Sequence, residues 1–126
     1  MNVLAIEKFE RLLNHYINTF TGSSVFTRAY AYAILDFFKG PDTALLPAVF
    51  ISSLEDDRSF KLWEETSERW DEKFANDSGN REENLKLQLI CDGLWFYILF
   101  DPSNSLDKQT ERLILNMCEK LGKENE

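Results

Sequence analysis

The stretch of residues 80–100, NREENLKLQLICDGLWFYILF, decides the fold of this chain. Asn80 can accept a hydrogen bond from the amides of a first helical turn, and Glu83, three residues on, can return one. The residues that follow have no wide polar face, and helical spacing gives them two apolar sides. One side holds Leu87, Cys91, Leu94 and Ile98, and the opposite side holds Leu89, Gly93, Phe96 and Phe100.

A helix with two apolar sides needs two covers, because a surface helix of a globular protein needs only one apolar stripe. We expect the side of Leu87 to face the chain's own core and the side of Leu89 to face a second copy of the chain. Gly93 supports this, since a glycine in mid-helix costs about 1 kcal/mol relative to alanine and permits close approach of a neighbour. The stretch predicts the central helix of an all-α domain at a dimer interface.

Composition limits the classes of protein that the chain can belong to. Its 126 residues suffice for one domain, and a hydrophobic fraction of 44% excludes a disordered chain. A formal net charge of −8 argues against binding of a phosphate backbone by this chain alone. The sequence has no apolar run long enough for a membrane span and no secretory leader, which predicts a cytoplasmic protein. Cys91 and Cys118, in apolar settings, are predicted to be reduced thiols.

Helical periodicity recurs along the whole chain, and no strand-like alternation accompanies it. We expect about six helices, over residues 3–20, 24–39, 42–54, 58–74, 80–100 and 107–121. Residues 21–24 offer a cap for the second helix, and Gly40-Pro41 ends it. Pro47 lies inside the third helix and predicts a kink or a late start there. The last helix is capped by Ser105 or Asp107.

Two further helices carry features that bear on function. The stripe of the fourth helix is aromatic with one small member, and its residues are Phe60, Trp63, Ser67, Trp70 and Phe74. Such a stripe usually packs in a core, but a small residue among rings could also leave a notch for a ligand. On the last helix Leu113 shares the apolar side with Ile114, whereas Leu115 is expected to point the other way, toward a partner.

Residues that could carry out catalysis are scarce. His15 is the sole histidine, and the helical wheel places it on the polar side of the first helix, where a solvated histidine is the ordinary outcome. A zinc site needs more His or Cys than the chain has, and no Glu-x-x-His pair indicates a di-iron bundle. The acidic residues fall on solvated faces, and no phosphate-binding loop or nucleophile elbow occurs. We therefore predict neither an enzyme, nor a metal site, nor a cofactor.

Three stretches together suggest a family. They are Phe26-Thr27-Arg28-Ala29-Tyr30 on the second helix, residues 44–63 with two helices about an acidic turn, and Ile90-Cys91-Asp92-Gly93-Leu94-Trp95 on the long helix. The chain resembles, over residues 3–121, the C-terminal ligand-binding and dimerisation domain of TetR-type transcriptional regulators. The resemblance implies an antiparallel helical bundle whose last two helices form a four-helix bundle in a homodimer. The three-helix DNA-binding domain of the family does not precede the first helix, so we expect a truncated or a naturally separate domain.

The resemblance also implies an effector pocket inside each subunit and DNA contact only through the absent N-terminal domain. Candidate pocket residues, which share inward faces and suit an apolar or aromatic effector, are Phe9, Leu13, Tyr16, Tyr30, Trp63, Ser67, Trp70, Cys91 and Trp95. Candidate dimer residues are Leu89, Gly93, Phe96, Phe100 and Leu115. Two alternatives stay open: a helical dimer with a structural or protein-interaction role, in which the rings only fill the core, and an enzyme with convergent carboxylates.

Overall fold

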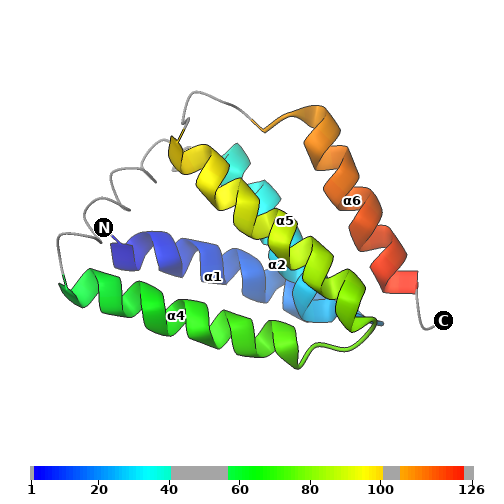
Figure 1. Ribbon diagram of the computed structural model, residues 1–126, viewed down its shortest axis with the longest axis horizontal. Helices are drawn as coiled ribbons and strands as arrows, with labels where there is room; N and C mark the ends of the chain where they lie inside the picture. The colour runs from blue at the N-terminus through cyan, green and yellow to red at the C-terminus, as the bar shows by residue number, and fades with distance from the viewer. Residues whose placement is uncertain (1, 41–56, 101–105, 124–126) are drawn as a thin grey trace.

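The structure is a computed structural model that describes residues 2–40, 57–100 and 106–123. These residues form five helices and no strand. Figure 1 shows how the helices are arranged. The helices are α1 (Asn2–Thr19), α2 (Val25–Lys39), α4 (Asp57–Ala75), α5 (Arg81–Phe100) and α6 (Lys108–Lys123). The all-α prediction is confirmed, while the helix predicted over residues 42–54, with Pro47, lies outside the described residues.

Helix α2 is the centre of the described fold. It packs against α1, α4, α5 and α6, and α5 crosses in front of it in Figure 1. Ten of its fifteen residues are buried, and its alanines allow this close packing, with Ala29, Ala31 and Ala33 fully enclosed. Figure 1 shows that α1 and α2 run in roughly opposite directions, as do α4 and α5, and α5 and α6.

Local sequence determines most of the helix ends. Asn80 Oδ1 accepts a hydrogen bond of 3.0 Å from the amide of Glu83, which confirms half of the predicted capping box at the start of α5. The Glu83 carboxylate pairs with Lys86 Nζ at 3.0 Å. Asp107 Oδ1 accepts from the amide of Gln109 at 3.0 Å and caps α6 as predicted.

The start of α2 is capped from a distant part of the chain. Ser24 has a left-handed backbone, with φ 58°, and makes no side-chain cap of its own helix. The Asp77 carboxylate, from the corner between α4 and α5, instead accepts hydrogen bonds from the amides of Phe26 and Thr27 at 3.3 and 2.8 Å. It also accepts from Thr27 Oγ1 at 2.8 Å. An acidic side chain at a helix N-terminus is favoured by the helix dipole as well as by these bonds.

Three more polar side chains join α2 to the same corner. The amide of Ser24 donates to Ser78 Oγ at 3.0 Å, and Ser24 Oγ donates to Asn84 Oδ1 at 2.6 Å. Asn84 Nδ2 donates to the carbonyl of Ser78 at 2.9 Å. Ser24 and Asn84 are buried, so these bonds replace water that the two side chains lose. We call Ser24, Asp77, Ser78 and Asn84 the corner network.

Arg28, in the first turn of α2, joins further helix ends at the same end of the molecule as the corner network. Its guanidinium donates to the carbonyls of Thr21 and Ser23, the latter at 2.9 Å, just beyond the end of α1. It also lies 5.0 Å from the ring centroid of Phe20, and a Cβ added at Gly122 of α6 would come 3.0 Å from it. A cation here favours the carboxyl-terminal ends of two helices at once.

Candidate functional site

The inward side of the fold is a group of aromatic rings, which we call the aromatic cluster. The ring of Phe9, on α1, lies at its centre, with centroids 5.2 Å from Tyr30 and Trp70 and 5.4 Å from Trp95. Most of the pairs meet edge to face, the arrangement that the ring quadrupole favours. The members of the cluster are Phe9, Phe26, Tyr30, Phe37, Phe38, Trp70, Phe74 and Trp95.

One hydrogen bond orders the cluster. Trp95 Nε1 donates to the hydroxyl of Tyr30 at 3.0 Å. Burial raises the pKa of the Tyr30 phenol far above its ordinary range, and the bond from Trp95 offsets only part of that effect. Tyr30 therefore remains a neutral hydroxyl, and the interior offers polar groups without charge.

Most of the predicted pocket residues come together here. Phe9, Leu13, Tyr30, Trp70 and Cys91 are all buried in the hydrophobic core, and Trp95 and Trp63 pack against it half-buried. Burial raises the pKa of the Cys91 thiol above its ordinary range, so it remains protonated and acts as a small apolar group. The inward faces of α1, α2 and α5 were thus predicted correctly for these residues, while their part in ligand binding stays a prediction.

Tyr16 does not join the aromatic cluster. It lies on α1 in a second group of rings, 5.5 Å from Phe20 and 5.3 Å from Tyr32. Its hydroxyl donates to the carboxylate of Asp36 on α2. Burial, together with this bond and the negative charge of Asp36, raises the pKa of Tyr16 to about 12. Tyr16 is therefore a link between α1 and α2 rather than a neighbour of Phe9.

Ser67 is the one predicted pocket residue that faces solvent, and this part of the α4 prediction is wrong. The small buried residue of α4 is Thr66, which is fully enclosed, and Phe60 at the predicted end of the stripe is 50% exposed. Trp63, Thr66, Trp70 and Phe74 span a sector of about 80° at 100° per residue, whereas Ser67 and Phe60 lie at its edge. The rotation of the helix is decided by its packing on α1 and α2, which periodicity does not specify.

The outward side of α5 is uncovered in the single chain. Leu89 and Phe96 are 60% and 57% exposed, and a Cβ built on Gly93 would meet no atom within 4 Å. By contrast Leu87, Cys91 and Leu94 on the opposite side are buried. Helix α5 is thus enclosed on one side only, and α2 rather than α5 occupies the centre of the described fold. Phe100 ends α5, and its side chain lies outside the described ones.

Leu115 does not belong to this outward side, contrary to our expectation. It packs half-buried against the core, whereas Leu113 is 53% exposed. The two lie one position either side of the buried Ile114, so a helical wheel gives each the same angular distance, about 100°, from the core direction. We call Leu85, Leu89, Gly93 and Phe96 of α5 and Leu113 of α6 the outer face.

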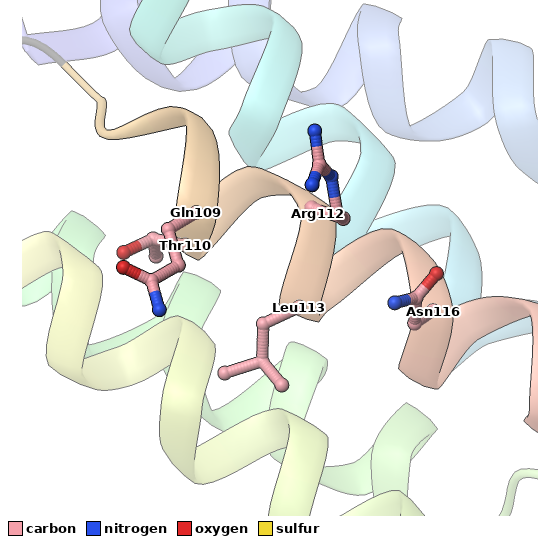
Figure 2. A pocket seen from close by; sticks show the side chains of 5 residues that line it. All are labelled: Gln109, Thr110, Arg112, Leu113 and Asn116. Atoms are coloured by element: carbon pink, nitrogen blue, oxygen red, sulfur yellow. The ribbon is translucent and has the colours of Figure 1, made fainter.

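Two open hollows are formed by described residues, and neither is lined by a predicted pocket residue. One, of about 380 Å³, follows α6 around Leu113, and Figure 2 shows this leucine among the polar side chains that line it. Its lining residues are Gln109, Thr110, Arg112, Leu113 and Asn116. The other, of about 630 Å³, lies where Phe26 and Ile17 meet Arg69 and Lys73 at the end of α4.

Within residues 2–40, 57–100 and 106–123, no three His, Cys, Asp or Glu side chains gather as metal ligands would. In the same ranges no helix is long and apolar enough to cross a bilayer.

Comparison with known protein families gives a match. Residues 24–119 match the family described as tetracyclin repressor-like, C-terminal domain. The matched range begins at the corner network and ends in α6, so it contains the aromatic cluster except for Phe9. Among curated proteins no match is found, and among solved structures none is found either.

Proposed function

This chain belongs to the family of tetracyclin repressor-like C-terminal domains, and we propose that it is the effector-binding and dimerisation domain of a TetR-like transcriptional regulator. The effector we propose is a small apolar or aromatic molecule, and the proposed action is repression that the effector relieves. Such domains are regulatory rather than catalytic. DNA contact would come from a separate N-terminal domain of the regulator, since this chain is acidic.

The observation that carries the proposal is the position of α5 between two surfaces. Trp95 lies inside, in contact with Phe9 and Phe38, while the next residue, Phe96, is exposed on the outer face. A molecule that enters among the rings must displace Trp95, and α5 carries Phe96 with it. Such a ligand shifts the conformational equilibrium only by the difference in its affinity for the two arrangements.

Helix α1 is the second element that a bound effector would move. Phe9 and Leu13 are buried against α2, and Phe9 touches rings from α2, α4 and α5. An effector that separates these rings would therefore also tilt α1. In a dimeric regulator the distance between two DNA-reading domains must match the spacing of the half-sites, so a small tilt suffices to weaken operator binding.

The outer face supports dimerisation through α5 and α6. Four of its members repeat at spacings of four, four and three on α5, which places them on one side of the helix. Exposed apolar patches with polar borders are typical of protein interfaces. A second copy on this face would give the four-helix bundle that the family resemblance implies, with Leu113 in place of Leu115 as the contribution of α6.

The first experiment tests dimerisation. We expect sedimentation equilibrium to give a dimer for the natural chain and a monomer for the double variant Leu89→Arg, Phe96→Glu. Ser67→Arg is the matched control, since Ser67 is exposed on α4 away from the outer face, and this variant should remain a dimer. A monomeric natural chain at about 100 µM, or a double variant that still dimerises, would contradict the proposed interface.

The second experiment tests the effector site. Titration with uncharged aromatic compounds should give a saturable change in tryptophan fluorescence, because Trp70 and Trp95 lie in the cluster. A Phe9→Trp variant, which fills the centre of the cluster with a larger ring, should bind these compounds more weakly while the dimer is retained. If no compound gives a saturable change in fluorescence, a structural or protein-interaction role explains the domain better than effector binding.

The second candidate is a helical dimer with a structural or protein-interaction role. The specific observation in its favour is the dense contact among the rings, since Phe9 lies within 6.0 Å of four other ring centroids. A core of this kind needs no ligand to fill it. This candidate predicts dimerisation through the outer face without any saturable response to aromatic compounds.

A further inference from the structure

The indole of Trp63 has a polar group without a partner. Among the described residues, Trp63 Nε1 is the buried side-chain nitrogen or oxygen that makes no hydrogen bond. The contrast is with Trp95, whose Nε1 donates to Tyr30 at 3.0 Å. Burial of a donor that loses its water without gaining an acceptor costs about 1–3 kcal/mol of stability. The presence of a tryptophan at position 63 therefore needs an explanation.

Trp63 lies on the inward face of α4. It packs half-buried against the hydrophobic core and shares its side of the helix with Thr66 and Trp70. Seven residues separate it from Trp70, about 10 Å along a helix. Trp70 in turn meets Phe9 and Tyr30 at 5.2 and 5.5 Å.

The surroundings limit the charge of such a molecule. The enclosed side chains near this face, Phe9, Thr66 and Trp70, are uncharged, and an indole donates one hydrogen bond but carries no charge. The carboxyl of Asp92, half-buried on α5, has a pKa raised by burial and by the charge of Asp71, so this side of the fold disfavours added negative charge. Arg69, which contacts Thr66 Oγ1 at 3.4 Å, is already paired with Glu10 at 3.2 Å, so a carboxylate on the ligand would have to compete with Glu10 for this cation, which is costly.

We propose that Trp63 is a specificity-determining residue of the effector site, and that its Nε1 donates to one neutral acceptor at the edge of an uncharged aromatic effector. Suitable acceptors are a carbonyl, an ether or a ring nitrogen. The inference rests on the proposed effector-binding function and adds to it the position and the chemical type of the polar contact. It also explains why a tryptophan with a free donor occurs where a phenylalanine would pack without that cost.

Naphthalene and quinoline form a matched pair of probes. They have the same shape, and quinoline carries one ring nitrogen that accepts a hydrogen bond and is uncharged near pH 8. We expect the preference of the protein for quinoline over naphthalene to fall about three- to tenfold in Trp63→Phe, the range expected for one neutral hydrogen bond. Comparing ratios between the two proteins removes the different solubilities of the free compounds.

Nuclear magnetic resonance of the unmodified chain gives an independent reading that needs no variant to fold. The three tryptophans should give three indole N–H signals. Quinoline should move the Trp63 signal downfield, naphthalene should not, and the Trp95 signal should keep the position set by Tyr30. If both compounds bind and the Trp63 signal responds alike to both, or Trp63→Phe keeps the full preference, this inference is wrong and the effector site stands. If neither compound binds, the effector site itself is wrong.

Discussion

At the residue scale, the corner network shows how much of this fold depends on a few polar contacts between distant residues. Asp77 and Thr27 are 50 positions apart, yet the Asp77 carboxylate accepts three hydrogen bonds at the start of α2. The family-like run of residues 26–30 contains much of this arrangement: Thr27 binds Asp77, Arg28 binds the end of α1, and Tyr30 lies in the aromatic cluster. Part of the family resemblance of residues 26–30 therefore reflects residues that stabilise the fold.

The replacement Asp77→Ala should lower the free energy of unfolding by about 1–2 kcal/mol, the usual cost of losing an N-cap. Urea unfolding followed by circular dichroism measures this. Asp71→Ala is the control, because Asp71 is an exposed carboxylate whose contact is with Gln88 at 3.3 Å, and it should cost less than about 0.5 kcal/mol. Equal effects of the two replacements would show that Asp77 does not act as a cap.

Tyr16 gives the chain a predictable loss of stability in alkali. Its pKa is raised from 10 to about 12 in the folded protein, so its contribution is complete below pH 10 and is lost as the pH rises toward 12. Over that range the unfolded chain releases a proton that the folded chain retains, which favours unfolding. The difference in urea midpoint between the natural chain and Tyr16→Phe should therefore shrink from pH 9 to pH 12.

Asp36→Asn is the test of the cause. It keeps an acceptor for the Tyr16 hydroxyl but removes the negative charge, so the pKa of Tyr16 should move back toward 10. Absorbance of tyrosinate during a pH titration reports this directly. An unchanged titration would mean that desolvation alone raises the pKa.

At the element scale, helix ends were predictable from the sequence, and helix rotations were less so. Asn80 and Asp107 cap α5 and α6 because a cap acts within three residues, so a local pattern is sufficient. Ser67 and Leu115 were misplaced because each lies at the edge of a stripe, where one position decides between core and solvent. The cap from Asp77 had no local signal, since only the folded chain brings the α4–α5 corner to α2. The aromatic cluster was largely predictable, because its rings occupy the middle of their stripes.

Gly93 allows the two sides of α5 to be tested separately. In the single chain Gly93→Ala meets no atom within 4 Å, so it should raise the stability of the subunit by about 0.5–1 kcal/mol through helix propensity. If backbone of a second copy approaches at this position, the same replacement should weaken the dimer. In a monomeric variant, we expect Gly93→Ala to raise the midpoint temperature of thermal unfolding. In the dimeric chain, we expect sedimentation to give a larger dissociation constant for the Gly93→Ala dimer than for the natural one.

Gly79→Ala is the contrasting replacement. Gly79 has φ of +91°, and a Cβ there would lie 2.3 Å from Ser24 Oγ, inside the corner network. We expect Gly79→Ala to lower the free energy of unfolding by more than about 1 kcal/mol.

If Gly93→Ala leaves the dissociation constant of the dimer unchanged, Gly93 has no role in close approach between subunits.

At the scale of the whole molecule, charge and apolar surface oppose each other. Each chain has a formal net charge of −8, so two chains repel at low salt, while the outer face offers apolar contact. The dissociation constant of the proposed dimer should therefore decrease when sodium chloride is raised from about 20 to 200 mM, because screening weakens repulsion and leaves burial of apolar surface intact. Sedimentation at the two salt concentrations measures it. A constant that increases with salt would indicate an interface held by charge pairs.

The long-range cap on α2 has a consequence for the order in which the protein is made. The ribosome releases α2 before Asp77 has been added, so the most apolar helix of the described chain is exposed while its first amides are uncapped and its rings are uncovered. Helix α2 is stabilised only later, when the α4–α5 corner emerges from the ribosome and packs against the start of α2. Nascent chains halted before residue 77 should therefore be captured by chaperones, and those released after α5 is complete should escape.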